Sequence, residues 1–315
     1  MRLECRPAAA FDTNRPKNGI AITQDSMKID PGEFRLTSAR KLHLAKRATD
    51  TRPLYRSEKH YQKKLVADVL ELNRLQHLIH ASAGYSILLV FQGMDTAGKD
   101  GVISHVLTGV NPQGCDVYSF KQPSPEELEH DFLWRATCRL PARGRIGVFD
   151  RSYYEEVLVV RVHAEKLRGE GLPDEPDGNH ALWHGRYRSI VQFEKHLHRN
   201  GTRIIKFFLH LSKEEQRKRL LERIDRPEKN WKFSEADITE RQFWPRYMRA
   251  YEDCLSATST KTAPWHIVPA DDKLNARLIV SRIVIDTLQR LNMRYPTLTR
   301  ARRRELRAIR ERLVT

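Results

Sequence analysis

The spacing of apolar residues changes along the chain, and the change predicts which segments form helices and which form strands. From Ser57 to residue 83, apolar residues recur every three or four positions, as in a helix that buries one face. Gly84 is expected to end this helix. The following run "YSILLVF" (85–91) is continuously apolar and rich in strand-forming residues, which is typical of a parallel strand buried on both faces.

Further runs between residues 115 and 270 repeat this alternation. The predicted strands are 115–120, 145–150, 202–211 and 264–270. Helix starts are predicted at Ser124 with Pro125 and Glu127, at Ser152 with Glu155, near Asn179, and at Ser212 with Glu215. The helix from Ser124 is expected to reach residue 140. Strands that alternate with helices predict an α/β fold with a parallel sheet, helices on both faces and a ligand site at the carboxyl ends of the strands.

Composition divides the chain into three regions. Residues 1–54 mix Pro, Gly, Asp and Arg without a sustained apolar period, so we expect a partly irregular extension that is loosely ordered or wraps the domain. Residues 55–294 carry the strand and helix pattern. Residues 295–315 form an Arg-rich helix pattern, interpreted as a solvated surface helix or as a segment that holds a polyanion or contacts another subunit.

Charge and cysteine content narrow the class of protein. With 56 basic and 40 acidic residues, the formal net charge is +16, which predicts a polyanionic partner: nucleic acid, a membrane surface or a phosphate-rich substrate. The four cysteines and 13 histidines show no zinc-binding spacing and no disulfide framework. No apolar run approaches the roughly 20 residues of a membrane-spanning helix. We therefore expect a cytoplasmic protein.

The stretch "FQGMDTAGKDG" (91–101) is the clearest motif. Gly93 to Gly98 with Lys99 matches the G-x-x-x-x-G-K part of a phosphate-binding loop, and it stands between a buried strand and a helix, where backbone N–H groups and the helix dipole attract an anion. Asp100 replaces the usual Ser or Thr and also suits the first turn of the helix. The residues predicted to bind phosphate are Gly93, Thr96, Ala97, Gly98, Lys99 and Asp100.

Asp95 and Asp150 are acidic residues in and near the predicted phosphate-binding loop, and a bound metal ion would explain their presence there. Asp150 ends the predicted strand 145–150, where a carboxylate commonly holds Mg²⁺ in proteins with such loops. Ser152 is the expected cap of the next helix, so Asp150 and Arg151 are free for metal or phosphate. Mg²⁺ binds a few carboxylates together with phosphate oxygens, so we predict that Asp95 and Asp150 face one Mg²⁺ (or Mn²⁺) site.

Residues 212–250 are too basic for a core and are predicted to form a helical lid. Arginines run along a first helix that breaks near Pro227, and a second helix begins around Ser234. Such a flap shields a transferred phosphoryl group from water; an exposed charged hairpin is the alternative. The nearby aromatic residues are expected mostly to anchor the lid rather than to sandwich a base. They are Trp231, Phe233, Phe243, Trp244 and Tyr247.

These motifs resemble the polyphosphate kinase 2 family over residues 55–291. The segments that carry the resemblance are "GMDTAGKDG", "NPQGCDVYSFKQPS", "HDFLWR", "FDRSYYEEVLVVRVH", "HLSKEEQRKRLLERIDRPEKNWKFS" and "VPADDK". The resemblance implies a P-loop kinase fold, a three-layer sandwich with a lid. It also implies transfer of a terminal phosphoryl group from inorganic polyphosphate to a nucleoside mono- or diphosphate with Mg²⁺ or Mn²⁺.

The resemblance also implies roles for single residues. Asp95 and Asp150 act on the metal and the acceptor phosphate, and Lys99, Arg151, Arg161 and an arginine of the lid helix, Arg219 or Arg223, line the phosphate path. The run "YYEEVLVVRVH" is similar to the class III branch, which accepts both AMP and ADP, although that branch often has Asn in place of Asp150. We expect a homo-oligomer, dimer or tetramer, with no nucleic-acid or membrane partner.

Two other functions fit parts of the pattern. An ATP-dependent kinase of a small molecule or of a nucleic-acid end has the same fold, but it normally keeps the Ser or Thr that Asp100 replaces. A non-catalytic nucleic-acid binder accounts for the positive charge, but the sequence shows no base-reading or zinc-finger motif.

Overall fold

In the computed structural model, residues 29–37, 42–172 and 180–314 are described. Their centre is a sheet of five parallel strands in the order β2-β3-β1-β4-β5, and every strand predicted from the apolar runs is confirmed. The strands are β1 (Ser86–Gln92), β2 (Cys115–Ser119), β3 (Ile146–Asp150), β4 (Thr202–His210) and β5 (Trp265–Pro269). Phe91 of the central strand pairs with Asp150 on one side and with Phe207 on the other, so the carboxyl ends of β1, β3 and β4 lie together.

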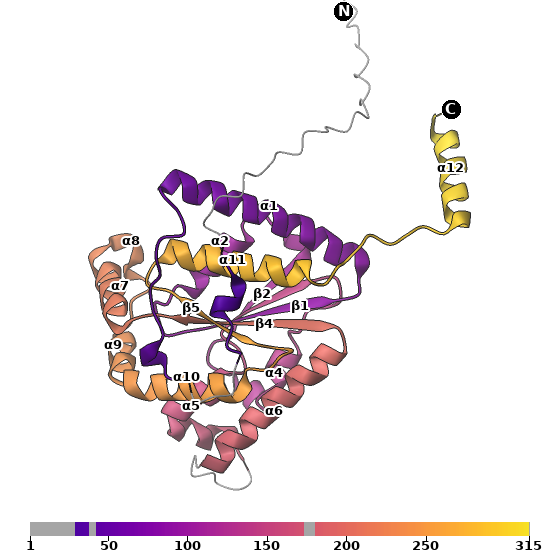
Figure 1. Cartoon of the computed structure of the whole chain (residues 1–315). Coiled ribbons are helices and arrows are strands. Elements are labelled where there is room, and N and C mark those ends of the chain that lie inside the picture. Colours follow the sequence, from indigo (N-terminus) through magenta and orange to yellow (C-terminus); the bar gives the residue numbers. More distant parts are fainter. Residues whose placement is uncertain (1–28, 38–41, 173–179, 315) are drawn as a thin grey trace, which may run out of the picture.

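Helices cover both faces of the sheet, as predicted (Figure 1). One face carries α1 (Glu58–Ser82), α2 (Lys99–Leu107) and α11 (Lys273–Gln289). The other carries α5 (Glu155–Val162), α6 (His180–Arg199) and α10 (Trp244–Thr258). Side chains of β1 alternate between the two cores because successive residues of a strand point to opposite faces, with Leu89 in one core and Leu88 in the other. The predicted three-layer α/β sandwich is confirmed.

Helix starts with a local signal are mostly where the sequence predicts them. The Ser57 side chain caps α1 by accepting from the His60 N–H, and the Ser124–Glu127 capping box is complete. The end of α1 agrees closely with the expected end at Gly84: Ser82 is its last residue, and Ala83, with φ of 47°, is the C-cap directly before Gly84. The start expected near Asn179 lies outside the described residues.

Two expected helices are wrong in extent or start. The segment 124–140 forms two single turns, α3 (Pro125–Leu128) and α4 (Trp134–Thr137), because the Asp131 carboxylate accepts from the Leu133 N–H and starts a new turn. Ser152 does not cap α5, which begins at Glu155. Its buried Oγ accepts instead from Gln92 Nε2 and from the Tyr154 N–H, each at 3.2 Å.

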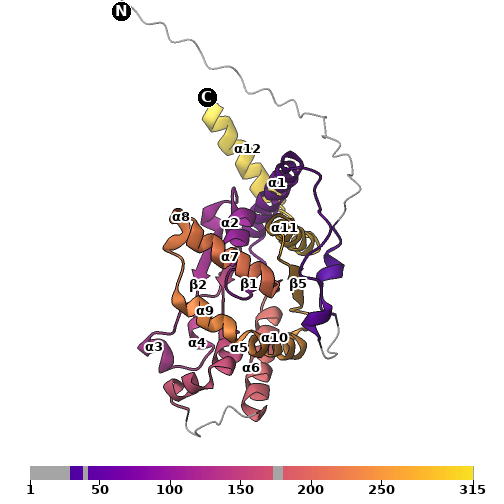
Figure 2. The same ribbon diagram turned by 90° about the vertical axis from the view of Figure 1, so that its left-hand side faces the viewer.

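The predicted lid crosses the carboxyl ends of the strands (Figure 2). It comprises α7 (Lys213–Asp225), α8 (Pro227–Asn230) and α9 (Glu235–Gln242), and it continues into α10. The break at Pro227 and the start at Ser234 are confirmed. Ser212 caps α7 through the Glu215 N–H, but the Glu215 carboxylate accepts from Arg219, so only half of that capping box forms.

Outside the sandwich, the described part of the N-terminal extension packs on the core, whereas the C-terminal helix does not. Leu36 and Leu44 of the N-terminal extension are buried in the core, and the backbone of Leu36 donates to Trp265 O at 2.8 Å. The extension also holds the short turns η1 (Pro31–Phe34) and η2 (Leu44–Lys46). By contrast, α12 (Arg300–Val314) is exposed throughout and stands away from the sheet (Figures 1 and 2). Among the described residues, no helix has the length and apolar character to span a lipid bilayer.

Candidate active site

The glycine loop needs its two glycines for different reasons. A Cβ added to Gly93 would lie 2.9 Å from the Leu209 carbonyl oxygen of β4 and 3.1 Å from Ala97 Cβ. The loop therefore approaches β4 too closely for any side chain at this position. Gly98 has φ of +95°, which L side chains rarely adopt. Both residues fix the path of the backbone immediately before α2, so the loop N–H groups stand at the amino end of that helix.

Lys99 and Thr96 point polar atoms into the loop. Lys99 is the first residue of α2, and its buried Nζ reaches back to the Gly93 carbonyl oxygen at 2.9 Å. Thr96 has φ of 66°, and among the described residues its buried Oγ1 has no hydrogen-bond partner. The Lys99 ammonium group and the unpaired Thr96 hydroxyl thus lie together in a tight glycine loop. Such a combination suits a phosphate ligand.

Asp150 presents an unpaired oxygen at the end of β3. Its Oδ2 accepts from Ser119 Oγ at 3.4 Å, whereas Oδ1 is buried and finds no hydrogen-bond partner in the described chain. Burial raises the pKa of Asp150; Lys99 and Arg151 oppose the rise, and the neighbouring Asp100 carboxyl adds to it. A carboxylate that has one buried, unpaired oxygen and lies next to a second carboxylate is suited to a cation.

Arg151 and Asp95 form an ion pair across the site. Arg151 Nη2 lies 3.3 Å from Asp95 Oδ1, and the backbone of Arg151 is left-handed, with φ of 63°. No described contact joins Asp95 to Asp150, whose carboxylate neighbour is Asp100. The shared Asp95–Asp150 metal site therefore stays a prediction, and the structure adds Asp100 as a further candidate oxygen donor.

Glu155 is a site residue that the sequence reasoning missed. We assigned it only to a capping box, yet its carboxyl lies among the charges of the site. Burial raises the pKa of Glu155, Arg151 and Lys99 lower it, and Asp95 raises it. The available signal was its position, because Glu155 opens the helix that follows the strand ending in Asp150.

Arg219 has a structural role, because its side chain bonds to the protein instead of lining an open phosphate path. Its Nε donates to Glu215, Nη1 to the carbonyl oxygens of Thr96 and Ala97, and Nη2 to those of Ala270 and Asp271, over 2.6 to 3.2 Å. Each of the five N–H donors of a guanidinium thus has a protein acceptor. This geometry favours a clamp between the glycine loop, α7 and the end of β5.

The other predicted phosphate-path arginines also have protein partners. Arg223 pairs with Asp237 at 3.3 Å and joins α7 to α9 within the lid. Arg161 donates to the Tyr187 hydroxyl and to Asp253, both at 2.6 Å, between α6 and α10. The structure does not bring Arg161 into contact with the glycine loop, so its phosphate role stays a prediction.

The lid is anchored by a group that includes a histidine. Glu240 of α9 accepts from the Tyr247 hydroxyl at 2.6 Å and lies 3.0 Å from His163 Nε2, and the Phe243 ring packs edge-on against His163. Tyr247 is buried, so it anchors the lid as expected. Trp231 is 77% exposed and is not an anchor. The lid contact of His163 was not predicted from the sequence.

The site fits a divalent cation that takes its ligands from both the protein and the substrate. Among the described residues, no group of three or more His, Cys, Asp or Glu side chains is placed to hold a metal ion by itself. Mg²⁺, however, is commonly held by one or two carboxylates, phosphate oxygens and water. The unpaired Oδ1 of Asp150 satisfies the protein part of such a set.

Comparison with known proteins gives consistent matches. The family model described as polyphosphate kinase 2 (PPK2) matches residues 55–296. The ADP-polyphosphate phosphotransferase of Rhodopseudomonas palustris is 58% identical over 288 residues, 91% of this chain and 100% of the relative. The AMP/ADP-polyphosphate phosphotransferase of Meiothermus ruber is 46% identical over 225 residues, 71% of this chain and 80% of the relative. The polyphosphate kinase 2 structure from Arthrobacter aurescens TC1 superposes with a TM-score of 0.79 at 39% identity, covering 89% of this chain and 97% of that chain.

Proposed function

The chain belongs to the polyphosphate kinase 2 family, and from that premise we propose that it transfers a phosphoryl group between inorganic polyphosphate and a nucleoside mono- or diphosphate. An oxygen of the terminal phosphate of the nucleotide attacks the terminal phosphorus of the polyphosphate chain. The anhydride bond to the next phosphate breaks, and the chain becomes one phosphate shorter. Because one phosphoanhydride replaces another, the reaction is reversible.

Charge neutralisation is the main task of the site in this reaction, since the transition state spreads negative charge over the phosphoryl oxygens. Lys99 stands inside the glycine loop and Arg151 stands beside it, so both supply positive charge to the phosphates. Mg²⁺ or Mn²⁺, when bound, adds to that neutralisation. We assign Asp150 as its main protein ligand, with Asp95 or Asp100 as the second carboxylate.

The observation that carries the proposal is the unpaired Asp150 oxygen beside the Lys99 loop, in the part of the chain that the family model matches. An ATP-dependent kinase of another substrate gains no support from the structure. Asp100 occupies the position of the usual Ser or Thr, and its carboxyl lies next to Asp150. Adenine nucleotides are the proposed acceptors, ADP first and AMP second.

We also propose that the protein works in the cytoplasm, in keeping with the free thiols of Cys115, Cys138 and Cys254.

The test is an assay with polyphosphate, magnesium and AMP or ADP in the complete absence of ATP, with products separated by chromatography. We expect formation of ADP from AMP and of ATP from ADP. Lys99→Ala and Asp150→Ala should each lower kcat by at least about 100-fold, the usual cost of removing one charge-stabilising group. Their thermal unfolding should match that of the wild type. Normal turnover in either variant contradicts the role assigned to that residue.

A further inference from the structure

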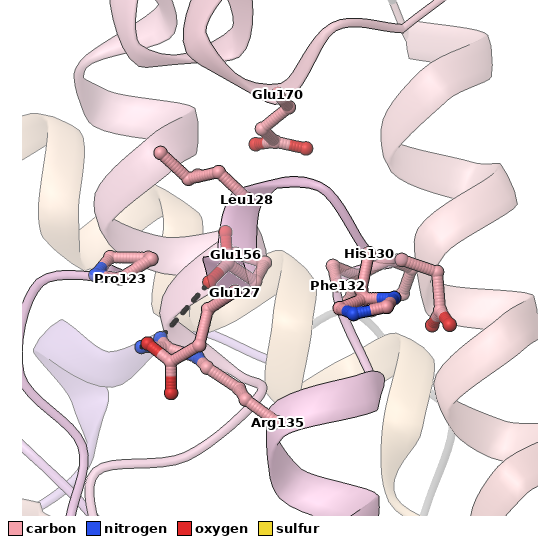
Figure 3. Close-up of a pocket in the computed structure, with 9 residues that line it drawn as sticks. Pro123, Glu127, Leu128, His130, Phe132, Arg135, Glu156 and Glu170 are labelled. Carbon is pink, nitrogen blue, oxygen red and sulfur yellow. Dashed lines mark hydrogen bonds and ion pairs between the residues drawn. The ribbon is translucent and has the colours of Figure 1, made fainter. Parts of the chain in front are cut away.

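A niche at the same end of the sheet as the glycine loop has a charge opposite to that of the whole chain. It lies between the segment that holds α3 and α4, the start of α5 and the end of η4 (Ala164–Glu170) (Figure 3). Arg135 ties it to the end of β2 through a hydrogen bond to the Lys121 carbonyl oxygen at 2.8 Å. Glu156 follows Asp150 by only a short segment, so the niche and the loop share one end of the sheet.

The walls of the niche are buried ion pairs. Arg135 Nη2 lies 3.1 Å from Glu156 Oε1, and Arg186 donates to the Glu156 carbonyl oxygen at 2.9 Å and pairs with the Glu170 carboxylate. Figure 3 shows Glu170 on one side of the niche and the Arg135–Glu156 pair on the other. Glu170 Oε1 is buried and has no hydrogen-bond partner within the described part of the chain.

The chemistry of these walls selects a neutral donor. Four carboxylates line the niche, against the guanidinium of Arg135 and that of Arg186, which pairs with Glu170: Glu127, Asp131, Glu156 and Glu170. This excess of acidic groups disfavours a phosphate, whereas a ligand N–H group finds an acceptor in the unpaired Glu170 Oε1. The space for a water-sized group is about 20 Å³, enough for one amino group or one water.

We propose that this niche reads the exocyclic amino group of the acceptor nucleobase, with Glu170 Oε1 as the hydrogen-bond acceptor and Phe132 as an apolar wall for the ring. The inference rests on the proposed function and adds base recognition to it. Phosphates bind at the cationic loop, and the base lies at the anionic niche. The protein thus distinguishes the phosphate end of a nucleotide from its base end by the opposite charges of the two binding sites.

The test compares ADP with purine riboside diphosphate, which lacks the amino group. A hydrogen bond to a charged acceptor predicts that wild-type kcat/KM with polyphosphate is about 10- to 100-fold higher for ADP. In Glu170→Gln the amide oxygen stays with Arg186, and the amide NH₂ group, a donor, faces the niche. The preference for ADP should therefore fall toward equality, with little change in thermal stability.

Glu129→Gln is the matched control. Glu129 is exposed, follows α3 and is not among the residues that line the niche, so the same Glu-to-Gln change removes one nearby negative charge without altering the niche. This variant should keep the wild-type preference for ADP. A wild-type enzyme that uses both nucleotides equally overturns the inference, as does an unchanged preference in Glu170→Gln; the niche then holds only a water.

The failure of the proposed function looks different. No transfer from polyphosphate to any nucleotide refutes the reaction, and calorimetric binding of ADP and of purine riboside diphosphate then decides on the niche alone. Tighter binding of ADP, lost in Glu170→Gln, supports base reading without the reaction. Equal affinities overturn it.

Discussion

Asp68 lies in the middle of α1 with an almost fully buried carboxylate, 2.7 Å from Arg282 Nη2. Burial raises its pKa from 3.8 to about 6, and Arg282 opposes the rise only in part. Because the folded-state pKa lies above the unfolded value, the ionised carboxylate destabilises the fold above pH 6. That cost disappears as the pH falls from about 6 to 4.

Asp68→Asn should therefore raise the free energy of unfolding at pH 7.5 by up to about 3 kcal/mol and give no gain near pH 4. Urea unfolding at both pH values measures this. Glu71→Gln on the same helix is the control, because hydrogen bonding to Arg74 lowers the pKa of Glu71 and its removal should give no gain. An equal gain at both pH values, or a loss at pH 7.5, contradicts the explanation.

Arg219 offers a second test at the scale of one residue. Lysine keeps the charge but cannot reach the carbonyl oxygens of Thr96, Ala97, Ala270 and Asp271 together. Arg219→Lys should lower the free energy of unfolding by about 2–4 kcal/mol, since buried carbonyls lose charged donors. Chemical denaturation measures it. Unchanged stability with a raised KM for polyphosphate instead supports the role in the phosphate path.

The contrast between Arg219 and Lys99 shows how far single residues can be predicted from the sequence. Lys99 follows its loop directly, so the motif alone places its amino group. Arg219 receives its partners from the segment directly after β5 and from a loop more than 120 positions away. No local sequence pattern predicts those contacts. Glu155 was missed for the same reason, and Asp100 was predicted to bind phosphate but not to lie next to Asp150, because these neighbours become visible only when the strands are side by side.

At the scale of elements, apolar period and capping signals predicted all five strands and the helical lid. These signals are local, since they depend on residues three or four positions apart. One error arose from a long-range partner and the other from a local hydrogen bond that the pattern did not reveal. Ser152 bonds to Gln92 of β1 instead of capping α5, and Asp131 interrupts the helix expected over 124–140.

The lid tether at Glu240 gives a prediction at this scale. Tyr247→Phe keeps the buried ring but removes the 2.6 Å hydrogen bond that holds α9. A looser lid admits water, so phosphate release from polyphosphate should rise several-fold relative to transfer to ADP. Both rates are measured in one assay. Tyr295→Phe, at an exposed tyrosine outside the lid, is the control and should leave the ratio unchanged. A wild-type ratio in Tyr247→Phe contradicts the tethering role.

At the scale of the whole molecule, the charge of +16 suits a long polyanion better than a single nucleotide. Polyphosphate engages several cations at once, so raising the salt concentration from about 50 to 300 mM should increase its KM much more steeply than the KM for ADP. Steady-state kinetics with sodium chloride measure both slopes. Equal slopes contradict an extended basic path for the chain. The homo-oligomeric state and the three-region division stay predictions.

The left-handed backbone at Arg151 carries a cost that the rest of the fold must absorb. Glycine would adopt this conformation freely and would be expected to gain about 1 kcal/mol. It would also delete the guanidinium that pairs with Asp95. Stability and chemistry thus place opposite demands on this position. Substitutions intended to raise the thermal stability of the enzyme should therefore be made at positions other than Arg151.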